Sequence, residues 1–275
     1  MNNSLFPSRA NCAVALGTSL KQKLRLLFYM AIKPSLVYRS LATFLNSRIL
    51  SFSIYDLRRR PILVYVRDNG VGTTTIAEFF SPHSVIMPPA LPTFYPKVIY
   101  DLGANVGVSS LFFASLYPNA SIYGFEPLPE NLEVCLLNYR GIANQSQVFP
   151  WAIGSKTGRA TFDCKNDSRG GRLETAHHDP SLQTTSQIQV MMISVADLID
   201  QEGLPPPDFL KIDVEGAELD VLEGIKGHAH SVRLIYLETH GEKLRRNCLL
   251  WLEGHKFQIC QGADRTAIWA WRPFP

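Results

Sequence analysis

The segment from Val98 to Leu111, V-I-Y-D-L-G-A-N-V-G-V-S-S-L, constrains the fold of this chain more than any other. Its first residues, Val98–Tyr100, are β-forming and apolar, which is typical of a buried strand. Gly103 and Gly107 follow, and apolar residues recur at helical spacing from Val108 onward. The pattern predicts a strand, a glycine loop and a helix. Glycines permit a tight turn and the close approach of a ligand, and the free N–H groups at the start of the helix point at that ligand.

The spacing of the glycines separates two classes of nucleotide-binding loop. Dinucleotide-binding loops read G-x-G-x-x-G, whereas this loop reads Asp101-x-Gly103-x-x-x-Gly107. That spacing resembles the first motif of S-adenosylmethionine-dependent methyltransferases with a doubly wound α/β fold. Glu126 follows the next predicted strand, Ser121–Phe125, 19 positions after Gly107. A carboxylate at about this distance takes ribose hydroxyls, and since nicotinamide enzymes share it, Glu126 indicates an adenosine ligand rather than a reaction.

The second half of the chain alternates predicted strands with predicted helices, as an α/β sheet requires. Further strands are predicted over 147–150, 209–213 and 232–237, and the strands 256–260 and 266–271 are predicted to form an antiparallel hairpin. Residues 155–190 are polar, and we expect them to hold hairpin strands that shape a substrate pocket. The predicted fold class is therefore α/β: a doubly wound, Rossmann-like sheet of seven mostly parallel strands that ends in an antiparallel hairpin.

Two of the predicted helices carry specific expectations. In the helix that follows Glu126, Leu132, Leu136 and Leu137 are expected to point inward. Glu215 and Glu218 are expected in the first turn of the helix after the fourth strand, where acidic residues suit the helix dipole without any further function.

The first 60 residues form a basic arm. They contain ten Lys and Arg and a single acid, Asp56, for a charge of +9, so that the remainder carries −6. Within the arm, an amphipathic helix is expected from Leu20, with its apolar residues on one face. Such a helix either covers an edge of the main domain, which we favour, or places residues 20–48 on an anionic membrane. Nucleic acid is not expected as a partner, because no aromatic residues interleave with the basic ones.

The N-terminal third is expected to end in an extended connection. Strands are predicted over 49–55 and 61–67 and a short helix over 74–80, and five prolines then fall within 81–96. We expect three parts: the arm over 1–60, an extension with the Pro-rich connection over 61–96, and the main domain over 97–275.

Cysteine use and hydropathy predict a cytoplasmic protein, with membrane association through the arm as an alternative. The five cysteines form no C-x-x-C pair, which favours a reducing compartment without a zinc site or a disulfide framework. No uncharged apolar run approaches the ~20 residues that span a bilayer, and no secretion signal is recognisable.

Several motifs together identify a family. The segments D-L-G-A-N-V-G-V-S-S-L, F-E-P-L-P-E-N-L, A-I-G-S-K-T-G, L-K-I-D-V-E-G-A-E-L-D-V-L-E-G and L-E-T-H resemble the FkbM family of S-adenosylmethionine-dependent methyltransferases, from Val98 to the C-terminus. The resemblance implies O-methylation of a hydroxyl on a sugar, polyketide, lipid or related metabolite. It implies that S-adenosylmethionine binds with its ribose on Glu126 and its adenine near Ala152. The residues expected around its methionine moiety are Asp101, Gly103, Ala104, Asn105 and Gly107.

The expected catalytic residues end two neighbouring strands. Asp213 and Glu238 lie at predicted carboxyl ends, where reacting groups gather in open α/β sheets, and His240 follows two residues later. One hypothesis is that Asp213, Glu238 and His240 hold a divalent cation that lowers the pKa of the acceptor hydroxyl. The other, which we favour, is that His240 acts as the base and is held by Glu238, without a metal.

A non-catalytic alternative competes with the enzyme. The chain could be a methyltransferase-like module that binds a partner or an anionic membrane through its basic arm. A degenerate relative would be expected to lose the loop glycines or the strand-end acids. Because Gly103, Gly107, Glu126, Asp213 and Glu238 are all present, we favour an enzyme.

Overall fold

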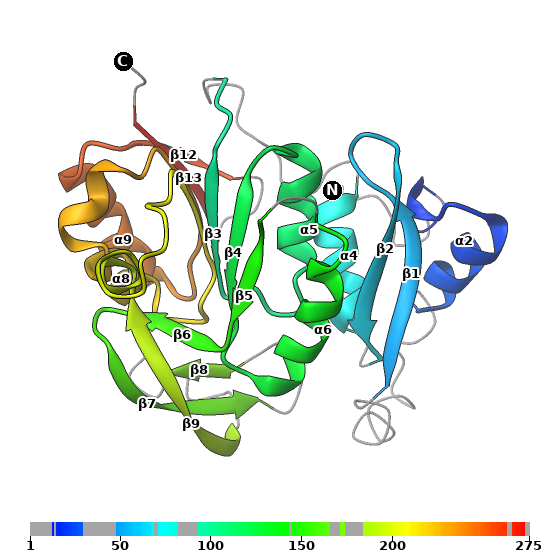
Figure 1. Ribbon diagram of the computed structural model, residues 1–275, viewed down its shortest axis with the longest axis horizontal. Coiled ribbons are helices and arrows are strands. Elements are labelled where there is room, and N and C mark those ends of the chain that lie inside the picture. The colour runs from blue at the N-terminus through cyan, green and yellow to red at the C-terminus, as the bar shows by residue number, and fades with distance from the viewer. Residues whose placement is uncertain are drawn as a thin grey trace, which may run out of the picture.

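A seven-stranded sheet with the order β12-β13-β11-β10-β3-β4-β5 forms the centre of the molecule (Figure 1). The computed structural model describes residues 13, 15–29, 48–68, 71–81, 93–142, 145–165, 171–173, 184–262 and 266–272. Five neighbouring strands are parallel: β3 (Val98–Leu102), β4 (Ser121–Phe125), β5 (Gln147–Phe149), β10 (Phe209–Ile212) and β11 (Leu234–Glu238). The antiparallel hairpin of β12 (Gln258–Gln261) and β13 (Ala267–Trp271) closes one edge. The predicted fold class is confirmed.

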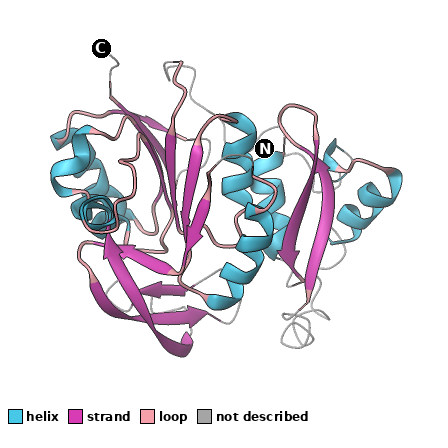
Figure 2. Cartoon of the chain, viewed as in Figure 1, coloured by secondary structure: helices cyan, strands magenta, loops and turns pink. Residues whose placement is uncertain are grey.

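Helices cover both faces of this sheet (Figure 2). On one face lie α5 (Val108–Leu116) and α6 (Pro129–Tyr139), and on the other α7 (Val195–Asp200), α8 (Glu218–Gly224), the 3₁₀ helix η3 (Lys226–His230) and α9 (Glu242–Gly254). Successive side chains of β3 feed opposite cores: Ile99 packs in the cluster with α5 and α6, whereas Tyr100 packs in the cluster with α8 and α9. Burial on both faces explains why these strands are continuous apolar runs.

A second sheet lies across the end of the main sheet to which β3, β4 and β5 run (Figure 1). Its order is β6-β9-β7-β8, with β6 (Trp151–Gly154), β7 (Gly158–Lys165), β8 (Gly171–Leu173) and β9 (Thr184–Ser194). Its small core includes Ala152 and Phe162, and it packs against Ala217 and Val214, which follow β10. The expected polar insertion therefore belongs to a second sheet, which lies along the carboxyl edge of the main sheet.

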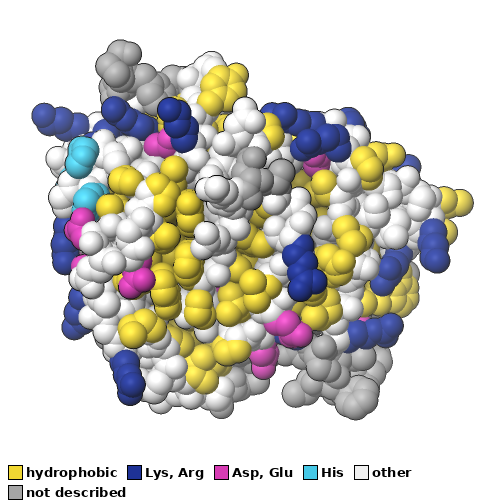
Figure 3. Space-filling view, viewed as in Figure 1, with side chains coloured by type: hydrophobic (Ala, Val, Ile, Leu, Met, Phe, Trp, Pro, Cys, Tyr) yellow, Lys and Arg dark blue, Asp and Glu magenta, His cyan; other side chains and the backbone are white. Residues whose placement is uncertain are grey.

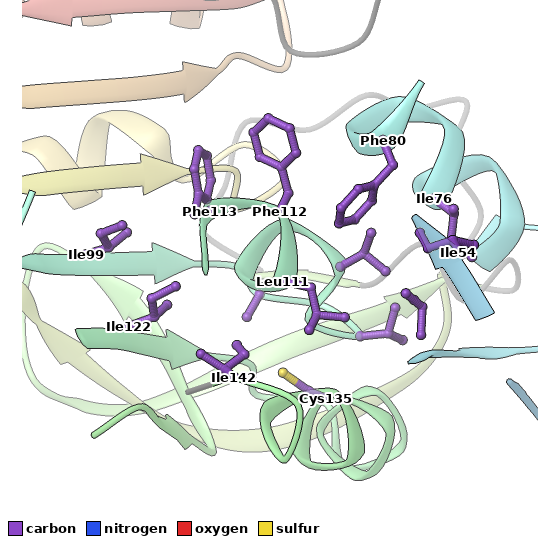
Figure 4. Close-up of a cluster of buried hydrophobic side chains, with 14 of the residues drawn as sticks. Ile54, Ile76, Phe80, Ile99, Leu111, Phe112, Phe113, Ile122, Cys135 and Ile142 are labelled. Carbon is purple, nitrogen blue, oxygen red and sulfur yellow. The ribbon is translucent and has the colours of Figure 1, made fainter. Parts of the chain in front are cut away.

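The two predicted N-terminal strands, β1 (Ile49–Tyr55) and β2 (Pro61–Arg67), have the predicted bounds, and they pair as a separate antiparallel hairpin. The hairpin and α4 (Val71–Phe80) pack on α5: Ile54, Ile76 and Phe80 point toward the same cluster as Leu111 and Phe112 (Figure 4). Buried residues from both sides of the predicted boundary at residue 97 thus share one core, while the three-part division itself stays a prediction.

Hydrogen bonds connect the β1–β2 hairpin to α6. The Asn138 side chain accepts from the Tyr65 N–H (2.8 Å) and donates to the Tyr65 carbonyl (2.8 Å) and to the Val106 carbonyl (2.6 Å). Arg67 donates to the carbonyl of Glu130 (3.0 Å). Because Val106 belongs to the glycine loop, Asn138 joins hairpin, helix and loop at one point.

The prediction for the inward face of α6 is wrong. Leu136 is 49% exposed and Leu132 and Leu137 are only half-buried, whereas Val134, Cys135 and Tyr139 are buried. The helix turns its polar Asn138 and the Tyr139 hydroxyl inward, where they make hydrogen bonds. A face chosen by leucines alone misses such buried polar contacts.

The arm is described only in part, because residues 1–12, 14 and 30–47 lie outside the described residues. Helix α2 (Leu20–Leu27) packs on β1 through the buried Leu26, so it covers the N-terminal hairpin, whereas an edge of the main domain was expected. Within the described residues, every helix is too short or too polar to span a bilayer. Cys135, Cys164, Cys248 and Cys260 are free thiols, and Cys12 lies outside the described part. Most of the Pro-rich stretch, residues 82–92, is also outside it.

Candidate functional site

The glycine loop leaves β3 through a series of left-handed residues. Gly103 (φ 79°), Asn105 (φ 51°) and Gly107 (φ 81°) adopt this conformation, and α5 begins at the next residue, Val108. A Cβ atom added at Gly103 would collide with the carbonyl oxygen of Asp213. Glycine at 103 is therefore required twice, for its φ angle and for the close contact with the turn after β10.

A buried ion pair lies directly beneath this loop. Lys211 on β10 and Asp101 on β3 are opposite each other in the parallel pair, and Nζ is 3.1 Å from Oδ1. The ammonium also donates to the carbonyl of Gly103 (2.6 Å) and lies 3.6 Å from a carboxylate oxygen of Asp213. Burial alone would lower the pKa of Lys211, but the carboxylates of Asp101 and Asp213 outweigh it and the pKa is raised. Lys211 is therefore charged.

Asp101 is fully buried and joins the strand to the start of α5. Its Oδ2 accepts from the hydroxyls of Ser109 (2.6 Å) and Ser110 (2.5 Å). The predicted contact of Asp101 with the methionine moiety stays a prediction. The observed contacts give the carboxylate a supporting role, since they hold the loop from below.

Glu126 lies at the end of β4, next to the loop. One carboxylate oxygen accepts from the backbone N–H of Asn105 (2.9 Å), and the other accepts from that of Leu128 (3.0 Å) and lies 3.5 Å from the Asn131 amide. Burial outweighs these hydrogen bonds and raises the pKa of Glu126 to about 7. The neighbouring rings of Phe149 and Trp151 stack with centroids 4.8 Å apart, immediately before the buried Ala152.

The ends of β10 and β11 bring the predicted catalytic residues together. Because the two strands are parallel neighbours, Asp213 and Glu238 leave the sheet at the same edge. His240 lies in the connection to α9, with Nε2 3.9 Å from Asp213 Oδ1. Glu238 is close enough to Asp213 and His240 for their charges to shift its pKa.

Two further acids join this group, which sequence reasoning assigned to the helix dipole. Nε2 of His240 lies 3.9 Å from Glu215, and Nδ1 lies 2.9 Å from the fully buried Glu218. Glu218 also accepts from the N–H of Gly216 (2.9 Å). We call Asp213, Glu215, Glu218, Glu238 and His240 the carboxylate–histidine cluster.

The expectation that Glu238 holds His240 is therefore wrong, since Glu218 holds it. The reason lies in the chain after β10. Glu215 (φ 56°) and Gly216 (φ 108°) form a left-handed turn, so that α8 begins only at Glu218 and Glu215 folds back toward His240. The glycine directly after Glu215 was the available signal for a turn in place of a first helical turn.

Burial and neighbouring charges shift the pKa values of His240 and Glu238. Burial would lower the pKa of His240, but the hydrogen bond to Glu218 and the charges of Asp213 and Glu215 raise it to about 9. Burial, together with the charge of Asp213, raises the pKa of Glu238 to about 7. At neutral pH, His240 is thus a cation held among carboxylates.

Part of the cluster has the donors of a cation site. Asp213, Glu215 and His240 each offer one ligand atom, and these atoms lie within 4.8 Å of one another. Two carboxylates suit Mg²⁺ or Mn²⁺. Glu238, which the metal hypothesis included, is replaced in this group by Glu215.

Three features define a Rossmann-like fold of the methyltransferase type. They are the strand order, the terminal hairpin, and the Gly103–Gly107 loop with Glu126 beside it. Comparison with known sequences narrows this class. The chain belongs to the family described as "Methyltransferase FkbM domain", whose sequence model matches residues 101–266. The resemblance noted from the motifs is confirmed.

The curated relatives carry methyltransferase names. The chain is 24% identical over 143 residues to hexuronic acid methyltransferase AglP of Haloferax volcanii, covering 52% of this chain and 56% of the relative. It is 30% identical over 158 residues to 2-O-methyltransferase NoeI of Sinorhizobium fredii, covering 54% and 65%. It is 24% identical over 194 residues to 31-O-demethyl-FK506 methyltransferase FkbM of Streptomyces tacrolimicus, covering 61% and 75%. The matched segment thus spans less than two thirds of the first two relatives.

Similarity to solved structures is weak. Precorrin-6y C5,15-methyltransferase from Geobacter metallireducens matches with a TM-score of 0.40 and 14% identity, over 73% of this chain and 86% of that one. The assignment of the fold rests on the strand order described above.

Proposed function

We propose that the chain transfers the methyl group of S-adenosylmethionine to a hydroxyl of a small-molecule acceptor, such as a sugar, a polyketide, a lipid or a related metabolite. The observation that carries the proposal is the carboxylate–histidine cluster beside the glycine loop, at the edge of the sheet where α/β enzymes bind their ligands. Family membership supports the reaction, and the names of the relatives support the acceptor class.

In this proposal the cofactor lies along the loop. The backbone of Gly103, Ala104, Asn105 and Gly107 surrounds its methionine moiety, and Asp101 supports the loop from below. Glu126 accepts hydrogen bonds from the ribose hydroxyls. The adenine lies near Ala152, beside the stacked Phe149 and Trp151.

The acceptor lies at the carboxylate–histidine cluster, where its hydroxyl must be aligned with the methyl group and lose its proton. Alignment is often the larger contribution, and a positioned base adds typically ~10²–10⁴-fold. Without a metal, His240 does not act as the base that the sequence suggested, because its raised pKa of about 9 keeps it protonated at neutral pH. The protonated His240 orients the acceptor instead, and a carboxylate of the cluster takes the proton. Asp213, Glu215 and His240 would be the residues that hold a divalent cation, which would require His240 to lose its proton, and the cation would then lower the pKa of the hydroxyl.

The test is methyl transfer from labelled S-adenosylmethionine to a panel of sugars, polyketides and hydroxylated lipids, with and without exhaustive chelation. We expect product with at least one hydroxylated acceptor. Activity that survives chelation rules out the cation route. Tight binding of NAD, with none of S-adenosylmethionine in calorimetry, would overturn the proposal.

An anionic membrane is the macromolecular surface that fits α2, and we propose a peripheral contact there. Leu20 (73% exposed), Leu24 (57%) and Phe28 (49%) are spaced four residues apart and form one exposed apolar stripe beside the exposed Lys21. Yellow and dark-blue side chains lie together on this side of the molecule (Figure 3). The stripe supplies apolar area and the lysines near it supply attraction to anionic lipid.

Flotation with vesicles of phosphatidylcholine and phosphatidylserine tests this contact. Truncation before Pro61 is unsuitable, because it would remove β1 from the hairpin. Leu20→Ser with Leu24→Ser should abolish flotation, whereas Leu250→Ser, at a 61% exposed position on α9, should not. Equal flotation of the wild type and the double variant would leave α2 with a structural role only.

A further inference from the structure

Lys211 is the one charged residue of a strand that is otherwise apolar and completely buried. β10 reads F-L-K-I, every position is buried, and the Lys211 side chain is 2% exposed. Burying an ammonium costs several kcal/mol unless it is paired and hydrogen-bonded. The chain meets this cost with three oxygen atoms from three different segments.

These three partners do not belong to one local structure. The carboxylate of Asp101 lies on β3, the carbonyl of Gly103 belongs to the cofactor loop, and the carboxylate of Asp213 belongs to the carboxylate–histidine cluster. The shortest contact, at 2.6 Å, is to the loop carbonyl. If Lys211 served only to neutralise the buried charge of Asp101, it would not need its contacts with the Gly103 carbonyl and the Asp213 carboxylate.

Asp101 has other hydrogen bonds that keep it in place. Ser109 and Ser110 donate to its Oδ2, whereas Lys211 lies on its other oxygen, Oδ1. This difference separates the roles of the two residues. The serines connect Asp101 to α5, and Lys211 connects the loop to Asp213.

We propose that Lys211 is a positioning residue that couples the cofactor loop to the carboxylate–histidine cluster. It holds the Gly103 carbonyl and the Asp213 carboxylate at fixed positions relative to each other, so that the bound cofactor also orders the turn 213–216. The inference rests on the proposed function, because it gives the loop to the cofactor and Asp213 to the acceptor.

Hydrogen exchange with and without S-adenosylmethionine tests the coupling without any acceptor. In the wild type, the cofactor should slow exchange in the loop, residues 103–107, and also in the turn, residues 213–216. In Lys211→Met, which has similar length and no charge, the loop should still be protected at saturating cofactor. The protection factor of the turn should fall at least about threefold relative to the wild type.

Two further variants complete the design. Ser109→Ala perturbs Asp101 without touching Gly103 or Asp213, and it should keep the protection of the turn. Lys211→Gln serves as a second variant if Lys211→Met does not fold, and it should lose the same protection. For an active acceptor, Lys211→Met should lower kcat by roughly 10–100-fold, the scale of a small misalignment, with a smaller change in the Kd of the cofactor.

The outcomes separate this inference from the proposed function. If the wild type does not bind S-adenosylmethionine, the proposed function fails. If the cofactor binds and protects the loop but not the turn in the wild type, or if the turn stays fully protected in both Lys211 variants, the coupling role is overturned and the proposed function stands.

Discussion

Proton release on cofactor binding is the consequence of the Glu126 environment that can be worked out furthest. Glu126 is 5% exposed, and burial raises its pKa from 4.5 to about 7. Ribose hydroxyls donate hydrogen bonds, which favour the ionised carboxylate. Binding of S-adenosylmethionine should therefore lower this pKa and release a proton between the lowered pKa and about pH 7, where the free protein holds the proton and the complex does not.

The magnitude follows from the two limits of that pKa. A return from about 7 to the ordinary value of 4.5 corresponds to about 3.4 kcal/mol, or ~300-fold in Kd. Affinity should rise with pH through this interval and become constant above it. Between pH 5.5 and pH 8, the expected gain in affinity is roughly 30-fold.

Calorimetry in buffers of different ionisation enthalpy measures the protons directly. About 0.9 proton should be released per cofactor at pH 6 and about 0.1 at pH 8 on the same linkage. Glu126→Gln cannot titrate, so its release at pH 6 should vanish, and its affinity should be lower at pH 8 by roughly 1.5–3 kcal/mol because a charged acceptor is lost. Little release by the wild type at pH 6, or release that persists in Glu126→Gln, would refute the assignment of the ribose to Glu126.

Four further outcomes are expected. The pKa of Glu126 is higher in the folded state than in the unfolded one, so the folded state binds more protons and the free energy of unfolding should fall as pH rises from 4.5 to about 7. Denaturant titrations of the cofactor-free protein should show that Glu126→Gln loses this dependence on pH. Asn138→Ala removes the hydrogen-bond partner of backbone groups of Tyr65 and Val106, and it should lower the free energy of unfolding by about 3–5 kcal/mol. The control Leu136→Ala, on the exposed side of α6, should lower it by less than about 0.5 kcal/mol. Gly103→Ala should abolish cofactor binding in calorimetry, because its Cβ would meet the carbonyl of Asp213. Asp213→Asn and His240→Ala should abolish methyl transfer with nearly unchanged cofactor affinity, and full activity of His240→Ala would remove it from the mechanism.

Strand positions were predictable where the hydrophobic pattern and the turn residues agree. The hairpin β1–β2 and the strand β4 have the predicted bounds, because apolar runs of strand length there end at turn or polar residues. The face of α6 was not predictable by the same means. Its orientation depends on Asn138 hydrogen bonds to a hairpin more than 70 residues away in sequence, and no local pattern contains that information.

For the candidate site, the proximity of the strand-end acids was predictable, and the hydrogen-bond partner of His240 was not. Parallel neighbouring strands deliver Asp213 and Glu238 to one edge, so their proximity follows from topology alone. The partner of His240 does not, because it depends on where a helix begins. The left-handed turn at Glu215 and Gly216 delays α8 and brings Glu218, instead of Glu238, to Nδ1 of His240.

The pairing of Lys211 with Asp101 was also predictable from the two strands. β3 and β10 are both buried, yet each contains one charged residue, Asp101 and Lys211, and in the parallel register these two residues are partners. Opposite charges at facing positions of two buried strands predict an ion pair, because neither charge is tolerated there alone. Asp101 lies two residues before Gly103, and Lys211 lies two residues before Asp213. The sheet therefore positions a buried charge between the Gly103 loop and Asp213, where its removal would act on both.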